Sequence, residues 1–262
     1  MAERRAGPVR LRRIGGTDSP VRGGSVPPRR ALVLGVMTLV LWAALGGTAY
    51  AGAVTSGSVL TSTKAAIAQQ TGVHVVFRAN RVSSATTEKI VADVGVTTGQ
   101  ETVSEGQSHV AIRVTPGYGY VSGDSSGLTA IFGLTADQAK KVGSDWVSWK
   151  AGTSQYANLK ADVTFAAVTA LLPGAKGTRL STGLTNGANV YVLKWTAAAS
   201  SSTPMLSNTL TVSASGQSLP IEQVSTASGG TKATTQLSGW GELVPASAPP
   251  AASTITSTKI TH

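Results

Sequence analysis

The stretch GYGYVSGDSSGLTAIF, residues 117–132, joins two kinds of secondary structure and so indicates the fold class. Its first part, YGYV, has the composition and alternation of a β-strand. Its last part places Leu128, Ile131 and Phe132 at i, i+3 and i+4, which is the spacing of one helix face. The sequence therefore predicts a strand-to-helix corner that begins a helical insert.

The same corner contains a G-x-S-x-G pattern centred on Ser125, the spacing of a hydrolase nucleophile elbow. A nucleophilic serine needs a histidine base and an orienting carboxylate. After Ser125 the chain has only His262, its last residue, and the earlier pair of His74 and Asp93 would crowd into one strand meander. We therefore interpret the stretch as a turn in which the glycines permit unusual backbone angles and Ser125 or Ser126 caps the helix, and we predict a non-catalytic protein.

Outward from the corner, the sequence alternates between helix and strand patterns. One helix is predicted over Ser56–Gln70, with Gly72 at its C′ position. A second begins at the capping box of Thr135 and Gln138 and ends at Gly143. A third is predicted over Asn158–Leu172, before Pro173. Strands are predicted over Val73–Ala79, Lys89–Thr98, His109–Val114 and 145–149, and from Gly177 onward there are only strands and turns, with a two-residue hairpin turn at Gly229-Gly230.

This order of elements is typical of an α+β domain with one large antiparallel sheet. Such a sheet must have one face covered, and the helices on either side of strand 145–149 are the predicted cover. The predicted fold class is therefore α+β, with a curved antiparallel sheet and helices packed on its concave face. The segment NVYVLKW, 189–195, is apolar on both faces and is predicted to be a central strand.

Helices that lie across the hollow side of a sheet leave an apolar pocket between the two layers. Aromatic and large aliphatic side chains of the insert and of the strands are the candidates to line it. These ligand-cavity candidates are Phe132, Trp146, Trp149, Phe165, Leu171, Leu172, Tyr191 and Trp195. The alternative for each of them is ordinary core packing. An acyl chain in such a cavity gains about 0.8 kcal/mol per buried methylene, so it needs no reactive group to hold it.

The N-terminal region resembles a membrane-targeting segment. Residues 1–30 carry the eight arginines that precede the apolar run 31–51, ALVLGVMTLVLWAALGGTAYA, which has no charged residue. This length crosses a hydrocarbon core about 30 Å thick, and the basic flank places the N-terminus in the cytoplasm. The run ends in an A-x-A site at Ala51, so it is either a transmembrane anchor or the core of a cleaved signal peptide. We expect either a single-pass cell-membrane protein with its domain outside the cytoplasm, or a secreted protein.

The remaining chain divides into an extracytoplasmic domain, 52–244, and a low-complexity C-terminal tail, 245–262, which is predicted to be loose. The net charge of +10 comes mostly from residues 1–30, so the sequence predicts no nucleic-acid partner. The chain has no cysteine, which excludes disulfides and thiolate sites. His74 and His109 lack a supporting acidic cluster, so the sequence predicts no metal or other cofactor, and it defines no oligomeric state.

Five segments carry a resemblance to a known family: LTSTKAAIAQQTGVHVVF (60–77), GYGYVSG (117–123), DWVSWKAG (145–152), LTVSASGQSLPIEQV (210–224) and TTQLSGWGELVPASAPP (234–250). In this order they resemble the LppX/LprG-type lipoproteins of actinobacteria, which share a half-barrel fold with the LolA/LolB lipoprotein carriers. The resemblance implies a half-barrel with a hydrophobic cavity that binds or carries lipids. The acylated cysteine of that family is absent, so any membrane attachment must come from residues 31–51.

These observations predict an extracytoplasmic module of the cell envelope that binds or carries a lipid or another amphiphile. The expected cavity measures several hundred cubic ångströms. The alternative is a membrane-anchored structural or sensory domain that acts through protein contacts, which predicts an exposed apolar patch on the outer sheet face or on the first helix.

Overall fold

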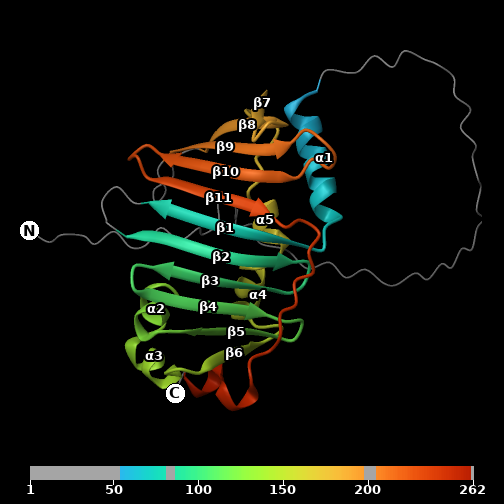
Figure 1. Cartoon of the computed structure of the whole chain (residues 1–262). Coiled ribbons are helices and arrows are strands. Elements are labelled where there is room, and N and C mark those ends of the chain that lie inside the picture. Colours follow the sequence, from blue (N-terminus) through green and yellow to red (C-terminus); the bar gives the residue numbers. More distant parts are fainter. Residues whose placement is uncertain (1–53, 81–85, 198–204, 261–262) are drawn as a thin grey trace, which may run out of the picture. The chain divides into compact units, whose positions relative to one another are not determined.

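The computed structural model describes residues 54–80, 86–197 and 205–260, which belong to one compact unit. Within these ranges a single twelve-stranded sheet contains every strand, in the order β12-β6-β5-β4-β3-β2-β1-β11-β10-β9-β8-β7 (Figure 1). The predicted segments 1–30 and 31–51 lie outside the described residues.

The strands are β1 Gly72–Asn80, β2 Thr87–Gly95, β3 Gly99–Glu105, β4 Ser108–Val114, β5 Tyr118–Gly123, β6 Trp146–Lys150, β7 Arg179–Thr185, β8 Ala188–Ala197, β9 Leu206–Ser213, β10 Pro220–Ala227, β11 Lys232–Ser238 and β12 Thr254–Thr256. The helices are α1 Ser56–Ala68, α2 Ser125–Ala130, α3 Ala136–Val142, α4 Ser154–Asp162 and α5 Phe165–Thr169, with short 3₁₀ turns η1 Ala251–Ser253 and η2 Ser257–Lys259.

The chain builds this sheet as two antiparallel meanders. The first runs from β1 to β6, and each strand pairs with the one before it. The chain then passes through α4 and α5 to the opposite edge, where the second meander runs from β7 back to β11. Strand β11 pairs with β1 and so joins the two meanders into one sheet.

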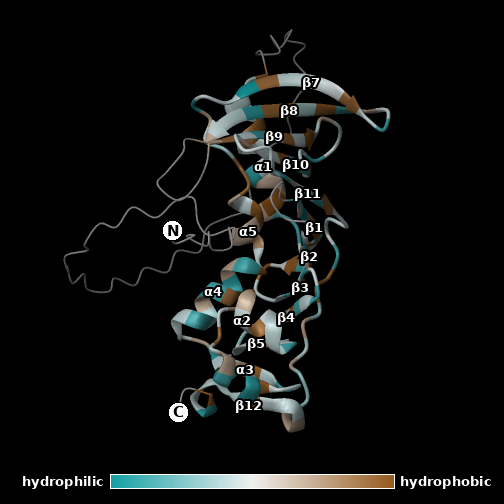
Figure 2. Ribbon diagram, turned by 90° about the vertical axis from the view of Figure 1, so that its left-hand side faces the viewer, coloured by the Kyte–Doolittle hydropathy of each residue, from teal (hydrophilic) through white to brown (hydrophobic). Residues whose placement is uncertain are grey.

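The helices α1, α2, α4 and α5 lie on one face of the sheet (Figure 2). Near the second meander, Val59 and Leu60 of α1 pack against Leu193 and Leu210 of β8 and β9. Near the first meander, α2, α3 and α4 cover a buried cluster that includes Val121. The fold is therefore α+β with an open, curled and mostly antiparallel sheet, as the sequence predicted.

Three local predictions differ from the structure in the first half of the chain. A strand that the sequence did not indicate, β3, fills the gap between β2 and β4. The helix predicted over 158–172 is divided into α4 and α5. The division occurs because Thr164 forms a parallel bridge with Gly95 and so leaves the helix. The residue before it, Val163, packs directly on β3: a Cβ on Gly99 would lie 1.9 Å from the Val163 carbonyl oxygen.

Gly72 was predicted as a helix C′ residue, but it begins β1. The reason for a glycine there is the C-terminal chain that crosses the strand end. A Cβ on Gly72 would lie 2.4 Å from the Glu242 carbonyl oxygen, and the Gly72 carbonyl accepts a hydrogen bond from the Gly241 N–H at 2.9 Å. The position therefore requires close backbone approach and not a left-handed conformation.

In the second meander, β8 is the second strand from the edge and not a central strand as predicted. Its Lys194 is exposed, so one of its faces is only partly covered. The predicted hairpin between β10 and β11 is confirmed. Its loop is longer than the predicted two residues: the hydrogen bond that closes the turn runs from the Ala227 N–H to the Thr231 carbonyl, at 2.9 Å.

The tail beyond residue 245 was predicted to be loose, yet its described part is ordered against the first meander. Strand β12 pairs in parallel with β6, and the Ser148 hydroxyl donates to the Ile255 carbonyl at 3.2 Å. Ile260 is only 3% exposed and belongs to the cluster beneath α2 and α4. The free edge of β6 and an apolar recess beside it stabilise a segment whose composition alone indicates no structure.

The close contact at Gly99 provides a test of this packing. We expect Gly99→Ala to lower the free energy of unfolding by about 3 kcal/mol, because the added methyl group meets a fixed backbone carbonyl. Urea unfolding followed by circular dichroism measures the change. Gly117→Ala is the matched control, since a Cβ there has nothing within 4 Å and should change stability by less than about 0.5 kcal/mol. Equal effects of the two substitutions would contradict this account of the α4–α5 division.

Candidate functional site

The strand-to-helix corner at Ser125 is confirmed, but an aspartate caps the helix. Asp124 is the N-cap of α2, and its carboxylate accepts hydrogen bonds from the N–H groups of Gly127 and His109, each at 2.6 Å. The Ser126 hydroxyl also donates to it. The Ser126 hydrogen bond is the main reason why the pKa of Asp124 is below its usual value; slight burial opposes this, and the two N–H groups reinforce it.

The two glycines of the motif serve close packing and not unusual backbone angles. Neither Gly123 nor Gly127 has a positive φ. A Cβ on Gly127 would lie 2.2 Å from the His109 carbonyl oxygen, and one on Gly123 would lie 2.4 Å from the same atom. The G-x-S-x-G spacing therefore lets the start of α2 rest directly on the backbone of β4.

The next turn of the chain directs large side chains toward β6. Gly133 has a φ of 86°, which only glycine adopts readily, and it reverses the chain after Phe132. The Leu134 N–H then donates to the Leu128 carbonyl at 2.9 Å. The predicted capping box begins α3, because Thr135 Oγ1 accepts from the Gln138 N–H at 3.2 Å and Gln138 Oε1 accepts from the Thr135 N–H at 3.0 Å.

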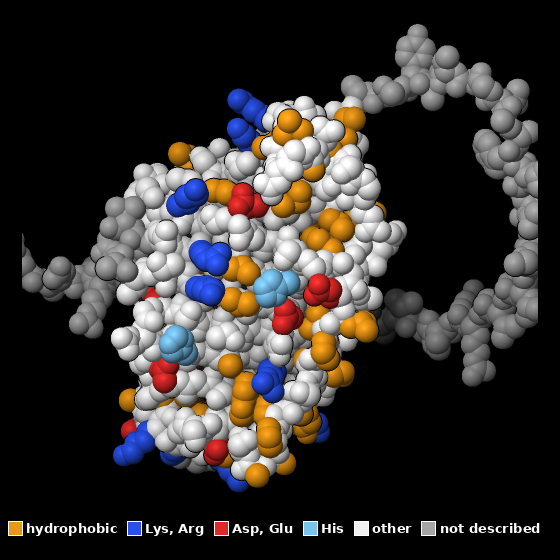
Figure 3. Space-filling model, viewed as in Figure 1, with side chains coloured by type: hydrophobic (Ala, Val, Ile, Leu, Met, Phe, Trp, Pro, Cys, Tyr) orange, Lys and Arg blue, Asp and Glu red, His pale blue; other side chains and the backbone are white. Residues whose placement is uncertain are grey.

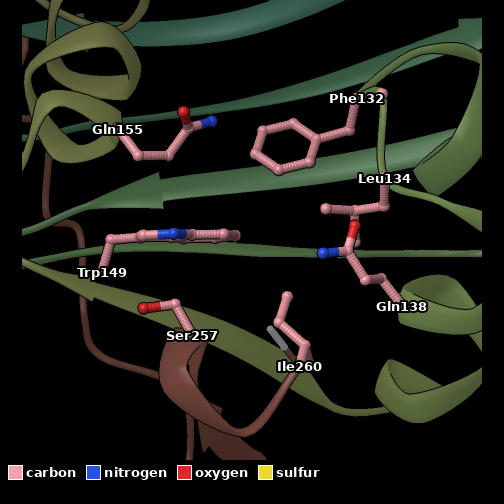
Figure 4. A pocket seen from close by; sticks show the side chains of 8 residues that line it. Phe132, Leu134, Gln138, Trp149, Gln155, Ser257 and Ile260 are labelled. Carbon is pink, nitrogen blue, oxygen red and sulfur yellow. The ribbon is translucent and has the colours of Figure 1, made fainter. Parts of the chain in front are cut away.

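A pocket of about 220 Å³ opens beside this turn (Figure 4). It is lined by Phe132, Gly133, Leu134, Gln138, Trp149, Gln155, Ser257 and Ile260. The rings of Phe132 and Trp149 are tilted by 50° with centroids 5.5 Å apart, and they form its aromatic wall. In Figure 4 the amide of Gln138 is directed into the pocket.

Five chain segments contribute to this pocket: the turn between α2 and α3, helix α3, strand β6, the start of α4 and the 3₁₀ turn η2 with the residue after it. Of the eight ligand-cavity candidates, the structure places Phe132 and Trp149 here. Gln138 was recognised from sequence as a capping residue, but not as a lining residue. Gln155 carries no sequence signal, and Ile260 belongs to the tail that was predicted to be loose.

The other six candidates lie elsewhere on the sheet. Trp146 is three residues from Trp149 on the same strand and therefore lies on the opposite face, where the Arg113 guanidinium is 4.8 Å from its ring centroid. This spacing was a signal present in the sequence. The remaining five are half-buried and pack against the two apolar clusters that include residues of α1 and α5. They are Phe165, Leu171, Leu172, Tyr191 and Trp195. Their role in ligand binding stays a prediction.

A second recess of about 440 Å³ runs along the outside of α4 and α5, lined by Gly152, Thr153, Tyr156, Ala157, Lys160, Ala161, Thr164 and Ala166. It is shallow and lined mostly by small side chains. The Tyr156 hydroxyl in it already donates toward the carbonyls of Thr115 and Pro116, each at 3.1 Å. The pocket at Phe132 and Trp149 is therefore the stronger candidate site.

The two histidines considered as metal ligands are separated. His74 lies on β1 and His109 on β4, with two strands between them. His74 Nδ1 lies 2.8 Å from Asp93 Oδ1, and Gln100 donates to the other carboxylate oxygen at 2.9 Å. Over the described ranges no cluster of three His, Asp or Glu side chains could hold a metal ion.

The Glu101 carboxyl group lies on the helix-covered side of the sheet, between two apolar neighbours on the adjacent strands. Glu101 of β3 is directly opposite Ala92 and Ile112. Burial, followed by the negative charges of Asp162 and Glu88, raises the pKa of Glu101 to about 8. The group is therefore largely protonated and uncharged at neutral pH, whereas in an unfolded chain it would be ionised.

This shift gives a pH dependence with a definite sign. The ordinary pKa of 4.5 in the unfolded chain is below the folded value of about 8. Between these values the folded state binds more protons, so the stability of the protein falls as the pH rises through that window. We expect Glu101→Gln to be increasingly more stable than the wild type from about pH 5 to about pH 8, and the difference to level off above this range.

Urea unfolding of both proteins at a series of pH values measures the difference. Glu222→Gln, on the opposite face of the sheet, controls for the loss of one negative charge. A constant difference between Glu101→Gln and the wild type across the window would show that the Glu101 carboxyl is not buried as described.

The described residues include no helix that is long and apolar enough to span a membrane. The run 31–51, which was predicted to do so, lies outside them.

Comparison with known proteins identifies no family by sequence: no protein-family model and no curated protein match the chain. Solved structures are similar to it in fold. The lipoprotein LppX of Mycobacterium tuberculosis is 16% identical with a TM-score of 0.46, over 73% of this chain and 99% of LppX. MucB in complex with MucA(peri) is 14% identical with a TM-score of 0.33, over 75% of this chain and 60% of MucB.

A DUF1329 family protein from Desulfovibrio piger is 10% identical with a TM-score of 0.32, over 73% of this chain and 93% of that one. At these identities the similarity concerns only the arrangement of strands and helices. The fold class of this chain therefore rests on its own strand order and register.

Proposed function

We propose that the domain binds an amphiphile through the pocket at Phe132 and Trp149, as a non-catalytic module of the cell envelope. The aromatic wall of this pocket, together with the Gln138 amide that also lines it, is the observation that supports the proposal. Small-molecule sites are typically apolar concavities with a few placed polar groups. The lining of this pocket matches that description.

The volume of the pocket limits the size of the ligand. At about 30 Å³ for each water-sized group, 220 Å³ holds about seven such groups. This is smaller than the several hundred cubic ångströms that the sequence predicted. The pocket therefore fits a short alkyl chain or one ring, and the rest of a larger amphiphile would lie outside it.

The polar side of the pocket indicates the chemistry of the ligand's head. Gln138 Oε1 already accepts the Thr135 N–H, so the Nε2 amide group is the part of Gln138 that remains to donate. None of the lining residues is charged. A neutral acceptor such as an ester or amide carbonyl suits this environment better than an ion, because no opposite charge is present to offset desolvation.

The proposed location follows from the N-terminal sequence. The basic segment 1–30 and the apolar run 31–51 favour a domain held at the outer side of a cell membrane, or secreted if the chain is cleaved after Ala51. An envelope location would expose the pocket to membrane-derived amphiphiles.

The binding proposal is tested with methyl octanoate as the probe, measured by isothermal titration calorimetry. Gln138→Glu preserves the capping-box acceptor, since Glu and Gln serve equally at this position, but it removes the Nε2 donor. We expect the probe to bind the wild type and to bind Gln138→Glu at least about tenfold more weakly, because a carboxylate then faces the ester carbonyl. Lys140→Gln, on the same helix and outside the pocket, should bind as the wild type does.

Absence of probe binding to the wild type would contradict the proposed function. Equal affinity of the wild type and Gln138→Glu would contradict the role of Gln138. A thermal melt of each variant verifies that the fold is retained.

A second candidate function, contact with another protein, is favoured by two exposed apolar side chains. Leu243 is 83% exposed, and Val96, in the turn between β2 and β3, is 60% exposed. The Thr98 hydroxyl donates to the Val244 carbonyl at 3.1 Å, which holds the two segments together. Exposed apolar side chains that gather in one patch mark contact surfaces.

The chain has no cysteine, so Leu243→Cys can carry a single photoreactive label. If this surface binds a protein, illumination on the cell surface should produce one discrete cross-linked species. A label at Gly174→Cys, away from this surface, is the control. No adduct at position 243, or the same adducts at both positions, would contradict the second candidate function.

A further inference from the structure

The sheet edge formed by β7 and β8 carries cationic side chains and no acidic one. Arg179 and Lys194 lie on these strands, and Lys176 lies just before β7. The sequence contains no Asp or Glu between Asp162 and Glu222, which includes all of β7, β8 and β9. The positive charge of this edge is therefore not offset by carboxylates within its own strands.

Two of these cations lie directly opposite each other. Arg179 pairs with Lys194 across β7 and β8, and both are exposed. Like charges in this position destabilise a strand pair. In the described ranges, no ion pair joins either of them to a carboxylate. A bound anionic surface would remove the repulsion that the isolated domain retains.

Figure 3 shows Lys and Arg side chains at the upper end of the molecule, over β7 and β8, with no acidic side chain beside them. Strand β7 is the outermost strand of the sheet. It also carries Leu184, which is 71% exposed. Leu184 is five residues from Arg179 and therefore points to the other face of the same edge strand. A lipid surface that met this edge would have the cations on one side of the strand and an apolar side chain on the other, and both kinds of side chain occur on surfaces that lie at a membrane interface.

The length of chain before α1 favours the same partner. The apolar run ends at Ala51 and α1 begins at Ser56, so only residues 52–55 separate them. Four residues reach at most about 14 Å. The first turns of α1 pack on β8, where Val59 contacts the cluster of Leu193. The chain therefore enters the domain beside the β7–β8 edge of the sheet.

We propose that the β7–β8 edge docks on an anionic lipid surface through Lys176, Arg179 and Lys194, with Leu184 at the lipid boundary. Electrostatic attraction of this kind acts within a Debye length, about 8 Å at physiological ionic strength, so it requires the closeness that the short linker provides. This inference goes beyond the proposed ligand pocket and uses none of its residues.

The absence of cysteine allows a site-specific test in the full chain. Leu184→Cys and Thr256→Cys each receive one environment-sensitive fluorophore. Strand β12, which carries Thr256, is the opposite edge of the sheet from β7. The labelled chains are reconstituted into vesicles of phosphatidylcholine, with or without phosphatidylglycerol, that contain lipid-bound quenchers.

We expect the label at position 184 to be quenched in vesicles with phosphatidylglycerol, and at least about twofold less in pure phosphatidylcholine or at about 1 M salt. The label at position 256 should remain unquenched. Arg179→Gln combined with Lys194→Gln should lower the quenching at position 184 at least about twofold. Lys140→Gln combined with Lys150→Gln removes the same charge elsewhere and should leave the quenching unchanged.

Equal quenching at positions 184 and 256, or no quenching at 184 with phosphatidylglycerol, would overturn the proposal. Quenching that is insensitive to the Arg179 and Lys194 substitutions would also overturn it. The pocket is tested by probe affinity and the docking edge by quenching, so the failure of one proposal is distinguishable from the failure of the other.

Discussion

The pairing of β1 with β11 is the interaction on which the rest of this domain depends. Seven residue pairs, from His74 with Ser238 to Asn80 with Lys232, join strands that are more than 150 residues apart. Without them the chain would form two separate meanders, each with unpaired backbone groups along an exposed edge. Helix α1 crosses the joined sheet, because its Ile67 packs with Leu237 and its Val59 packs with Leu210. The common apolar face therefore exists only after this long-range pairing has formed.

The pocket depends on a second long-range contact, made by the end of the chain. Strand β12 covers the free edge of β6, and this places Ser257 and Ile260 against Trp149. Phe132 of the aromatic wall comes from the turn between α2 and α3, and Gln138 of the polar side comes from α3 directly after it. Asp124 and the glycines near it hold the start of α2 against β4. Three stretches that are distant in sequence, 132–138, 149–155 and 257–260, thus converge on one small cavity. A change in any of them alters its shape, because close-packed interiors transmit small displacements.

The two proposed surfaces lie near opposite edges of the sheet. The ligand pocket adjoins β6, next to the β12 edge, and the cationic surface is formed by β7 and β8 at the other edge. A domain that rests on lipid by the β7–β8 edge would therefore present its pocket away from that surface. This arrangement separates attachment from binding, so each has its own residues and its own dependence on salt and on apolar contact.

The sequence by itself determined the local features: the corner at 117–132, the capping box at Thr135, most strands, and an α+β fold with helices on one face. These follow from periodicity and capping, which act over a few residues. It also identified Phe132 and Trp149 as candidate lining residues. Only the tertiary structure decided that Ile260 lines the pocket and that β8 lies near an edge. The physical reason is that strand neighbours, glycine contacts and the docking of the tail depend on backbone groups brought together from distant positions, which no local pattern encodes.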